Sequence, residues 1–158
     1  PNGSYEAKKA TPAEEHSGEG IGLETGVLTQ KQISLMMKHL PVEVSFVDEN
    51  DTVQFYSDTP DRIFPRSPGV IGRTVQNCHP PKSIEIVNRI VESFRSGEKD
   101  HADFRIEHKG RYVLIRYFAI RDDDGAYQGT VEVTQDITDI RDLSGEQRLL
   151  DWDSGNKQ

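Results

Sequence analysis

The chain has 158 residues, which suits one domain with tails, and its formal net charge is -8. Such an acidic surface repels phosphate backbones, so we expect no nucleic acid partner. The apolar runs are too short to cross a bilayer and no signal peptide is visible, so we expect no membrane association. The single cysteine, Cys78, cannot form an internal disulfide and is no framework for a metal site, which indicates a reducing, cytoplasmic location and no bound metal.

Residues 1–28 contain few apolar side chains and many Gly, Glu, Lys, Ser and Thr residues. A segment of this composition buries too little surface to offset the entropy lost on ordering, so we expect a disordered linker. Since the chain starts at Pro1 rather than at a methionine, we also expect it to be part of a longer protein.

A first helix is predicted to begin after Thr29. Thr29 and Gln32 have the spacing of a capping box, and Pro41 is expected to end the helix. The apolar face of this helix either packs on its own domain or pairs with a second copy or an upstream domain. The residues of that face follow helical spacing: Ile33, Met36, Met37 and Leu40.

Alternating apolar residues predict an antiparallel hairpin over 42–56, with a turn at 48–51 where Asp and Asn residues gather. Residues 58–70 are rich in Pro and Gly and are expected to be irregular, and 71–78 are expected to form a short helix. A long amphipathic helix should begin at Pro80 and Pro81 and end at Gly97. Its apolar face consists of Val87, Ile90, Val91 and Phe94.

Three more strands are predicted over 102–106, 111–121 and 127–135, with turns between them. The strand 111–121 has apolar residues on both faces, which indicates that both sides of the sheet are covered. This order predicts an α+β domain over 29–140, followed by a polar tail over 141–158. We expect an antiparallel five-stranded sheet with helices on one face and an N-terminal flanking helix.

Several short motifs occur in an order that resembles a PAS domain. The motifs are the apolar-Gly-Arg step, a His-Pro before the long helix, an Arg-Asp-x-x-Gly hairpin and a closing Asp-Ile-Thr: Ile71-Gly72-Arg73, His79-Pro80, Arg121-Asp122 to Gly125, and Asp136-Ile137-Thr138. The resemblance covers roughly Leu40 to Thr138. It implies a sensory and docking module rather than an enzyme, and no catalytic constellation is visible in the sequence.

Longer segments resemble the C-terminal PAS domain of bacterial and archaeal proteins that carry a hemerythrin-like (HHE) domain upstream and whose function is unknown. This resemblance implies that the linker would join such a domain as a partner within the same protein. The segments are Leu40-Pro41, Phe46-Val47-Asp48, Ile63-Phe64-Pro65-Arg66-Ser67-Pro68, Cys78-His79-Pro80-Pro81-Lys82-Ser83 and Gly145-Glu146-Gln147-Arg148-Leu149-Leu150.

PAS domains bind flavin, haem or small metabolites between the sheet and the long helix, and some bind nothing. The position of a flavin-reactive cysteine is occupied here by Val75, and the helical position of a haem-binding histidine is apolar, near Ile86. A haem or redox site that uses His79 and Cys78 remains an alternative, so the cofactor is unknown. The expected lining of the ligand cavity is Phe46, Phe55, Ile86, Ile90, Phe104, Leu114, Val131 and Gln135.

Arg73, Cys78 and His79 form a second candidate site, for an anion or for redox chemistry. Arg73 belongs with Arg62 and Arg66 to a local basic cluster, which either forms salt bridges or holds an anionic ligand. His79 is otherwise expected to cap the long helix, and Cys78 to fill a small apolar space.

The resemblance implies that Asp136 and Thr138 form the signal junction after the last strand. The domain's own helices are expected on one face of the sheet, so the other apolar face needs a cover from elsewhere. Together with the apolar first helix, this face predicts a homodimer. We therefore expect a regulatory sensor or dimerisation module with a small ligand in an apolar cavity, and a ligand-free dimerisation module remains an alternative.

Overall fold

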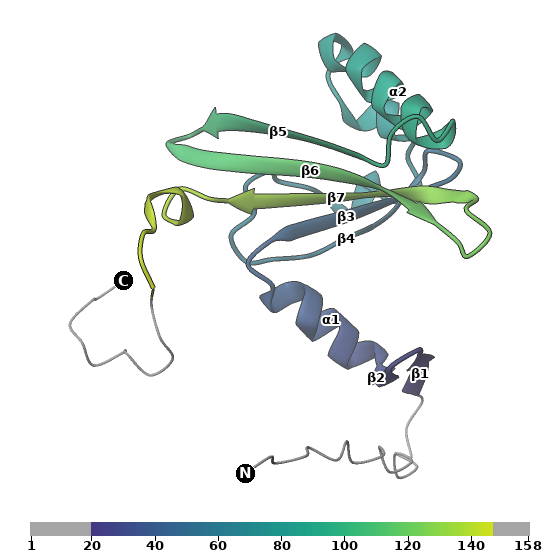
Figure 1. The fold of residues 1–158 in the computed structure, drawn as a ribbon, viewed down its shortest axis with the longest axis horizontal. Helices are drawn as coiled ribbons and strands as arrows, with labels where there is room; N and C mark the ends of the chain where they lie inside the picture. Colours follow the sequence, from purple (N-terminus) through teal and green to yellow (C-terminus); the bar gives the residue numbers. More distant parts are fainter. Residues whose placement is uncertain (1–19, 147–158) are drawn as a thin grey trace, which may run out of the picture. The chain divides into compact units, whose positions relative to one another are not determined.

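The computed structural model describes residues 20–146, which fall into a unit up to Met36 and a larger unit from Met37 onward. In the first unit, β1 (Gly20–Leu23) and β2 (Gly26–Thr29) pair as an antiparallel hairpin (Figure 1). The prediction of a disordered linker is therefore wrong for residues 20–28, while residues 1–19 lie outside the described part. Apolar residues that alternate on each side of the turn, such as Ile21 opposite Leu28, allow this pairing.

Helix α1 (Gln30–His39) begins as the capping box predicts. The backbone N–H of Thr29 donates to Gln32 Oε1 at 2.8 Å, and the N–H of Gln32 donates to Thr29 Oγ1 at 3.2 Å. These two bonds satisfy amides that the first turn of a helix leaves free.

The second unit contains a five-stranded antiparallel sheet with the order β4-β3-β7-β6-β5 (Figure 1). The strands are β3 (Glu43–Asp48), β4 (Val53–Tyr56), β5 (His101–His108), β6 (Arg111–Arg121) and β7 (Tyr127–Asp136). The predicted hairpin and the predicted meander are both present, and β7, the last strand of the meander, pairs with β3 of the hairpin. The predicted α+β class with an antiparallel five-stranded sheet is confirmed.

Helix α2 (Pro81–Arg95) is the long helix that the sequence predicts. Val91 and Phe94 are buried, and the helix contacts β6 and β7. Gly97 ends it with a φ of +78°, a conformation that glycine adopts without strain. Between β4 and α2 the chain forms only two short 3₁₀ helices, η1 (Pro68–Val70) and η2 (Val75–Cys78). The tail predicted over 141–158 begins inside η3 (Ile140–Asp142), and its part from 147 onward lies outside the described residues.

The two faces of the sheet carry different side chains, as the strand register shows. We call the face toward α2 the inner face; it includes Val47, Ile115, Tyr117, Thr130 and Glu132. We call the opposite one the outer face; it includes Phe46, Phe55, Leu114, Phe118, Val131 and Gln135. Residues directly opposite one another in antiparallel strands share a face, as do Phe46 and Val131.

Candidate functional site

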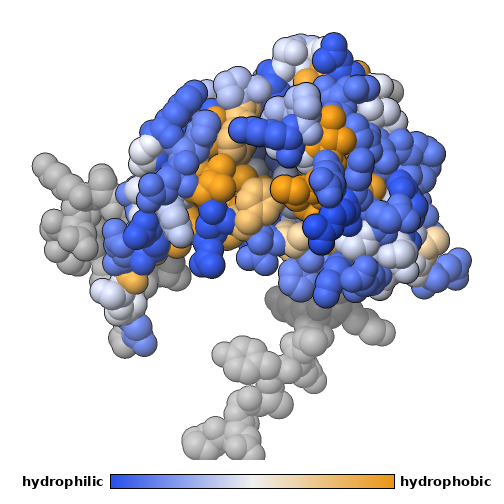
Figure 2. Space-filling view, turned by 90° about the horizontal axis from the view of Figure 1, so that it is seen from above, coloured by the Kyte–Doolittle hydropathy of each residue, from blue (hydrophilic) through white to orange (hydrophobic). Residues whose placement is uncertain are grey.

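A cavity of about 860 Å³ lies between α2, η2 and the inner face of the sheet. Most of its wall is apolar, and its polar lining comes from β6, β7 and the loops before α2. The surface that carries α2 and β5, uppermost in Figure 1, has a band of apolar side chains bordered by hydrophilic ones (Figure 2). Two apolar residues of these elements, Ile86 and Phe104, line the cavity and are still 59% and 40% exposed. The cavity therefore has an open side.

Three of the residues predicted for the cavity lie on it: Ile86, Ile90 and Phe104. The other predicted lining residues lie on the outer face, so the prediction is wrong for Phe46, Phe55, Leu114, Val131 and Gln135. The prediction places the apolar side chains of β3, β4, β6 and β7 on the cavity, and this exchanges the two faces of these strands. A shift of one residue moves every side chain of a strand to the other face.

The strand residues on the cavity are instead Val47, Ile115, Tyr117, Thr130 and Glu132. Apolarity alone gives no signal for Thr130 and Glu132. For Glu132 the signal is the basic cluster, because a buried carboxylate in a sheet needs a cation that reaches the same face.

The cation is Arg66, whose Nη2 lies 3.2 Å from Glu132 Oε1, with both side chains 16% exposed. Thr134 Oγ1 also donates to Glu132 Oε1, at 3.2 Å. Burial, the charge of Glu132 and a hydrogen bond with that carboxylate raise the pKa of Tyr117, so its hydroxyl stays protonated. We call Arg66, Tyr117 and Glu132 the polar end of the cavity.

Arg62 forms a second buried ion pair, with Nη2 3.0 Å from Glu43 Oε2. Its Nε donates to the carbonyl of Phe64 at 3.2 Å, and the backbone N–H of Ile63 donates to Glu43. Burial lowers the pKa of Arg62, which Glu43 opposes. These bonds fix the loop after β4 on the sheet, so Arg62 has a structural role and the salt-bridge interpretation holds for Arg62 and Arg66.

The second candidate site predicted from the sequence is part of the same cavity. Its residues Arg73, Cys78 and His79 line the cavity together with Ile86 and Ile90. His79 Nδ1 lies 2.8 Å from the carbonyl oxygen of Val75, to which it donates a hydrogen bond. The Cys78 thiol is free and half-buried. Among residues 20–146, no group of three or more His, Cys, Asp or Glu side chains has the arrangement of a metal site.

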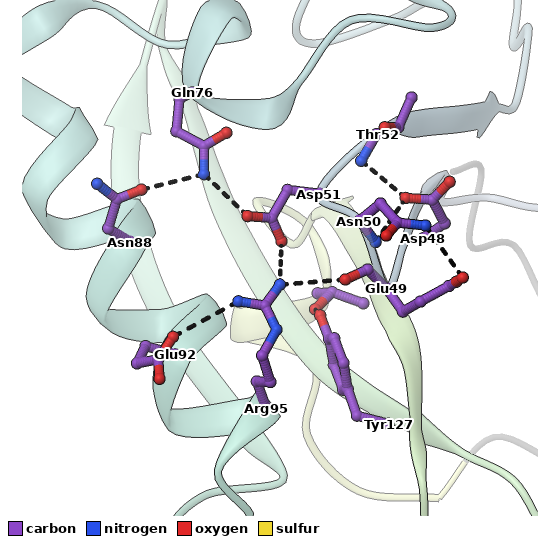
Figure 3. Close-up of polar contacts among 11 residues, drawn as sticks. Asp48, Glu49, Asn50, Asp51, Thr52, Gln76, Asn88, Glu92, Arg95 and Tyr127 are labelled. Carbon is purple, nitrogen blue, oxygen red and sulfur yellow. Dashed lines mark hydrogen bonds and ion pairs between the residues drawn. The ribbon is translucent and has the colours of Figure 1, made fainter.

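A polar network holds α2 to the turn between β3 and β4 (Figure 3). Arg95 Nη2 lies 2.6 Å from Asp51 Oδ1 and donates to the carbonyl of Glu49 at 3.2 Å. Gln76 Nε2 donates to Asp51 Oδ2 and to Asn88 Oδ1, both at 3.1 Å. The network therefore joins η2 and α2, two walls of the cavity, to one end of the sheet.

The predicted junction residues Asp136 and Thr138 contact one another at the end of β7. Asp136 Oδ1 accepts from the Thr138 backbone N–H at 3.0 Å and from its hydroxyl at 2.5 Å. Thr138 Oγ1 accepts from the backbone N–H of Tyr112, at 2.8 Å. These bonds fix the chain that leaves the sheet to the start of β6.

The sheet order, the single long helix across one face and the cavity between them define an α+β fold with a cavity large enough for a small molecule. Residues 33–138 match the family model of the PAS domain, so this chain belongs to the PAS domain family. PAS domains are generally sensory, non-catalytic modules. Within residues 20–146, no helix is long and apolar enough to cross a membrane.

Solved structures agree with this assignment. A crystal structure of a C-terminal domain from Streptococcus mutans is 34% identical, with a TM-score of 0.75 over 80% of this chain and 98% of that one. VqmA of Vibrio cholerae, described as a dimer and a LuxR-type receptor with target DNA, is 26% identical, with a TM-score of 0.51 over 72% of this chain and 54% of that one. The PAS domain of BvgS from Bordetella pertussis is 16% identical, with a TM-score of 0.52 over 68% and 85%, and shows the fold alone. No curated protein matches the chain.

Proposed function

We propose that this PAS domain is a regulatory sensor module that binds a small organic molecule in the cavity between α2 and the inner face. The observation that carries this proposal is the cavity itself. Its volume of about 860 Å³ is within the range of small-molecule sites, and it combines apolar walls with a few polar groups at one end. The half-buried Ile90 lies on the α2 wall, so it is suited to a test by substitution.

The test is ligand binding by the wild type and by Ile90→Phe, which would fill part of the cavity. A panel of small apolar compounds should raise the melting temperature of the wild type and have a much smaller effect on the variant. Leu114→Phe enlarges a half-buried residue of the outer face and serves as the control. Equal responses of wild type and Ile90→Phe would place binding elsewhere.

A haem or redox module is a second candidate, supported by His79 and Cys78 on the cavity wall. Because Nδ1 donates to the carbonyl of Val75, Nε2 is the nitrogen through which His79 would bind a metal. An absorption spectrum of the purified protein separates the candidates. A Soret or flavin band that is lost in His79→Ala or Cys78→Ala would favour the second one.

We also propose that the domain is a homodimer whose contact includes the outer face. Phe55 and Phe118 are 38% and 36% exposed there. In the register, Phe46 lies opposite Phe55, and Val131 lies between Phe46 and Phe118. VqmA, at 26% identity, is described as a dimer. Because this chain carries a net charge of -8, we do not extend the DNA binding of VqmA to it.

The position in a longer protein is a further proposal. The Streptococcus mutans relative is described as a C-terminal domain, and this chain covers 98% of it. This supports placing the PAS domain after another domain, for which the sequence resemblance suggests a hemerythrin-like one. We place the protein in the cytoplasm, where the single thiol of Cys78 stays reduced.

A further inference from the structure

The polar end of the cavity holds an arginine that is only partly satisfied. Arg66 uses a single nitrogen, Nη2, for both oxygens of Glu132, at 3.2 and 3.4 Å, instead of the two-nitrogen contact of a paired guanidinium. Its Nε is buried and has no acceptor among the described residues. A buried donor without an acceptor is unfavourable, so the Arg66 guanidinium is only partly satisfied by the protein. Its Nη1 makes no hydrogen bond to the described residues either, and Arg66 lines the cavity, so this nitrogen can receive an acceptor from a bound molecule.

The charge of Arg66 is nevertheless already balanced. Glu132 pairs with it, and both side chains are mostly buried, at 16% exposed. Burial and the charge of Glu132 raise the pKa of Tyr117, which means that the polar end disfavours a further negative charge. A carboxylate placed beside Arg66 would meet the same burial and the same repulsion from Glu132, so an uncharged acceptor fits better.

The rest of the cavity favours an apolar body. The ring centroid of Phe104 lies 5.8 Å from that of Tyr117 at the polar end. The other apolar walls include Ile90 and Val91 of α2, Ile106 of β5 and Ile115 of β6. We propose that the ligand is an uncharged, largely apolar molecule with one hydrogen-bond acceptor, such as a carbonyl oxygen, which binds the guanidinium of Arg66. This inference rests on the proposed function, because it names the class of ligand for the same cavity.

The competing arrangement is an amphipathic carboxylate whose charge stays at Arg73. This side chain lines the cavity, is exposed, and has no ion pair among the described residues. An anion held there would keep its charge near water and place only its apolar part inside.

Three naphthalenes that carry a substituent of equal size at the same ring position separate these arrangements: methyl naphthyl ketone, isopropylnaphthalene and naphthoate. Their affinities for the wild-type protein are measured by calorimetric titration. The ketone should bind about tenfold more tightly than isopropylnaphthalene, since a hydrogen bond to a charged donor has about that effect. Naphthoate should bind more weakly than the ketone.

The double variant Arg66→Met and Glu132→Gln removes the donor without leaving its partner charge unpaired. It should lose the preference for the ketone while isopropylnaphthalene binds as before, and Arg73→Met is the matched control that should keep the preference. If the double variant does not fold, the order of the three probe affinities for the wild-type protein still tests the inference.

Three results would overturn the inference in different ways. Equal binding of ketone and isopropylnaphthalene would leave a purely apolar cavity, and the proposed sensor function would stand. Tightest binding of naphthoate, lost in Arg73→Met, would establish the anion arrangement. Binding of none of the three probes would contradict the proposed function and this inference together.

Discussion

Arg95 and Asp51 join the last turn of α2 to the turn between β3 and β4, with Nη2 and Oδ1 2.6 Å apart (Figure 3). Asp51 also accepts from Gln76 of η2, and the guanidinium of Arg95 lies over the ring of Tyr127 at 5.7 Å. One carboxylate thus connects three segments that surround the cavity. Since α2 and η2 line the cavity, this connection fixes two of its walls to one end of the sheet.

Asp51→Asn should weaken this connection. The Asp51 side chain is only 20% exposed, so the loss should exceed that of an ordinary surface pair and reach about 1–2 kcal/mol in the free energy of unfolding. Urea denaturation measures it. Glu92→Gln is the control: it removes the other pair of Arg95, which is 3.5 Å long with Glu92 73% exposed, and should cost less than about 0.5 kcal/mol. Equal effects of the two variants would contradict a special role for Asp51.

The sequence predicted the fold well because its local signals are strong. The capping box of Thr29 and Gln32 and the period of α2 each depend on neighbours within one or two turns. The side of the sheet that faces the cavity could not be predicted in the same way. Phe46 and Val131 are apolar but lie on the outer face, whereas Glu132 lies on the cavity.

The reason is that a buried carboxylate depends on a partner far away in the sequence. Glu132 is acceptable inside because Arg66, from the loop after β4, pairs with it. Periodicity within β7 contains no information about that pair. The outer face remains apolar at Phe55 and Phe118, and a single chain therefore offers two apolar faces between which hydrophobicity alone cannot choose.

Gly129→Ala should destabilise the domain. Gly129 has a φ of +140°, and a Cβ there would lie 2.2 Å from the carbonyl oxygen of Val47 on the adjacent β3. Because backbone atoms cannot move aside cheaply, we expect a loss of about 1–3 kcal/mol or more in the free energy of unfolding. Gly110→Ala is the matched control: its φ is +80° but no atom lies within 4 Å of a Cβ. A larger loss in the control would mean that φ rather than the close approach dominates.

Phe118→Asp should convert the proposed homodimer into a monomer. The side chain lies on the outer face and is 36% exposed, so a carboxylate reaches water in the monomer but would be buried in a contact through this face. Light scattering at tens of micromolar measures the mass. Ile86→Asp puts the same charge on α2, on the other side of the sheet, and should remain a dimer. A wild-type monomer at this concentration would contradict the homodimer itself.

Asp136→Ala should destabilise the junction after β7, and mainly at pH values above the acid range. The hydroxyl and the backbone N–H of Thr138 both donate to this carboxylate and hold its pKa below the ordinary value. A group with a lowered folded pKa stabilises the protein above its unfolded pKa, about 4, and loses this contribution as the pH falls through the folded pKa. The difference in unfolding free energy between wild type and variant should therefore be largest near neutral pH and shrink in acid. Asp142→Ala, 83% exposed, is the control and should show little difference at any pH.

The same variant tests whether Asp136 and Thr138 act in coupling rather than in ligand binding. Neither residue lines the cavity, so loss of Asp136 should leave the cavity unchanged. Because Thr138 Oγ1 accepts from the backbone N–H of Tyr112, the same loss should loosen the chain where it leaves the sheet. We expect Asp136→Ala to alter the dimer affinity in light scattering while the affinity for a cavity ligand stays within about twofold, the scale of a perturbation below roughly 0.5 kcal/mol. An unchanged dimer with weakened ligand binding would reverse this assignment and place Asp136 in the support of the cavity.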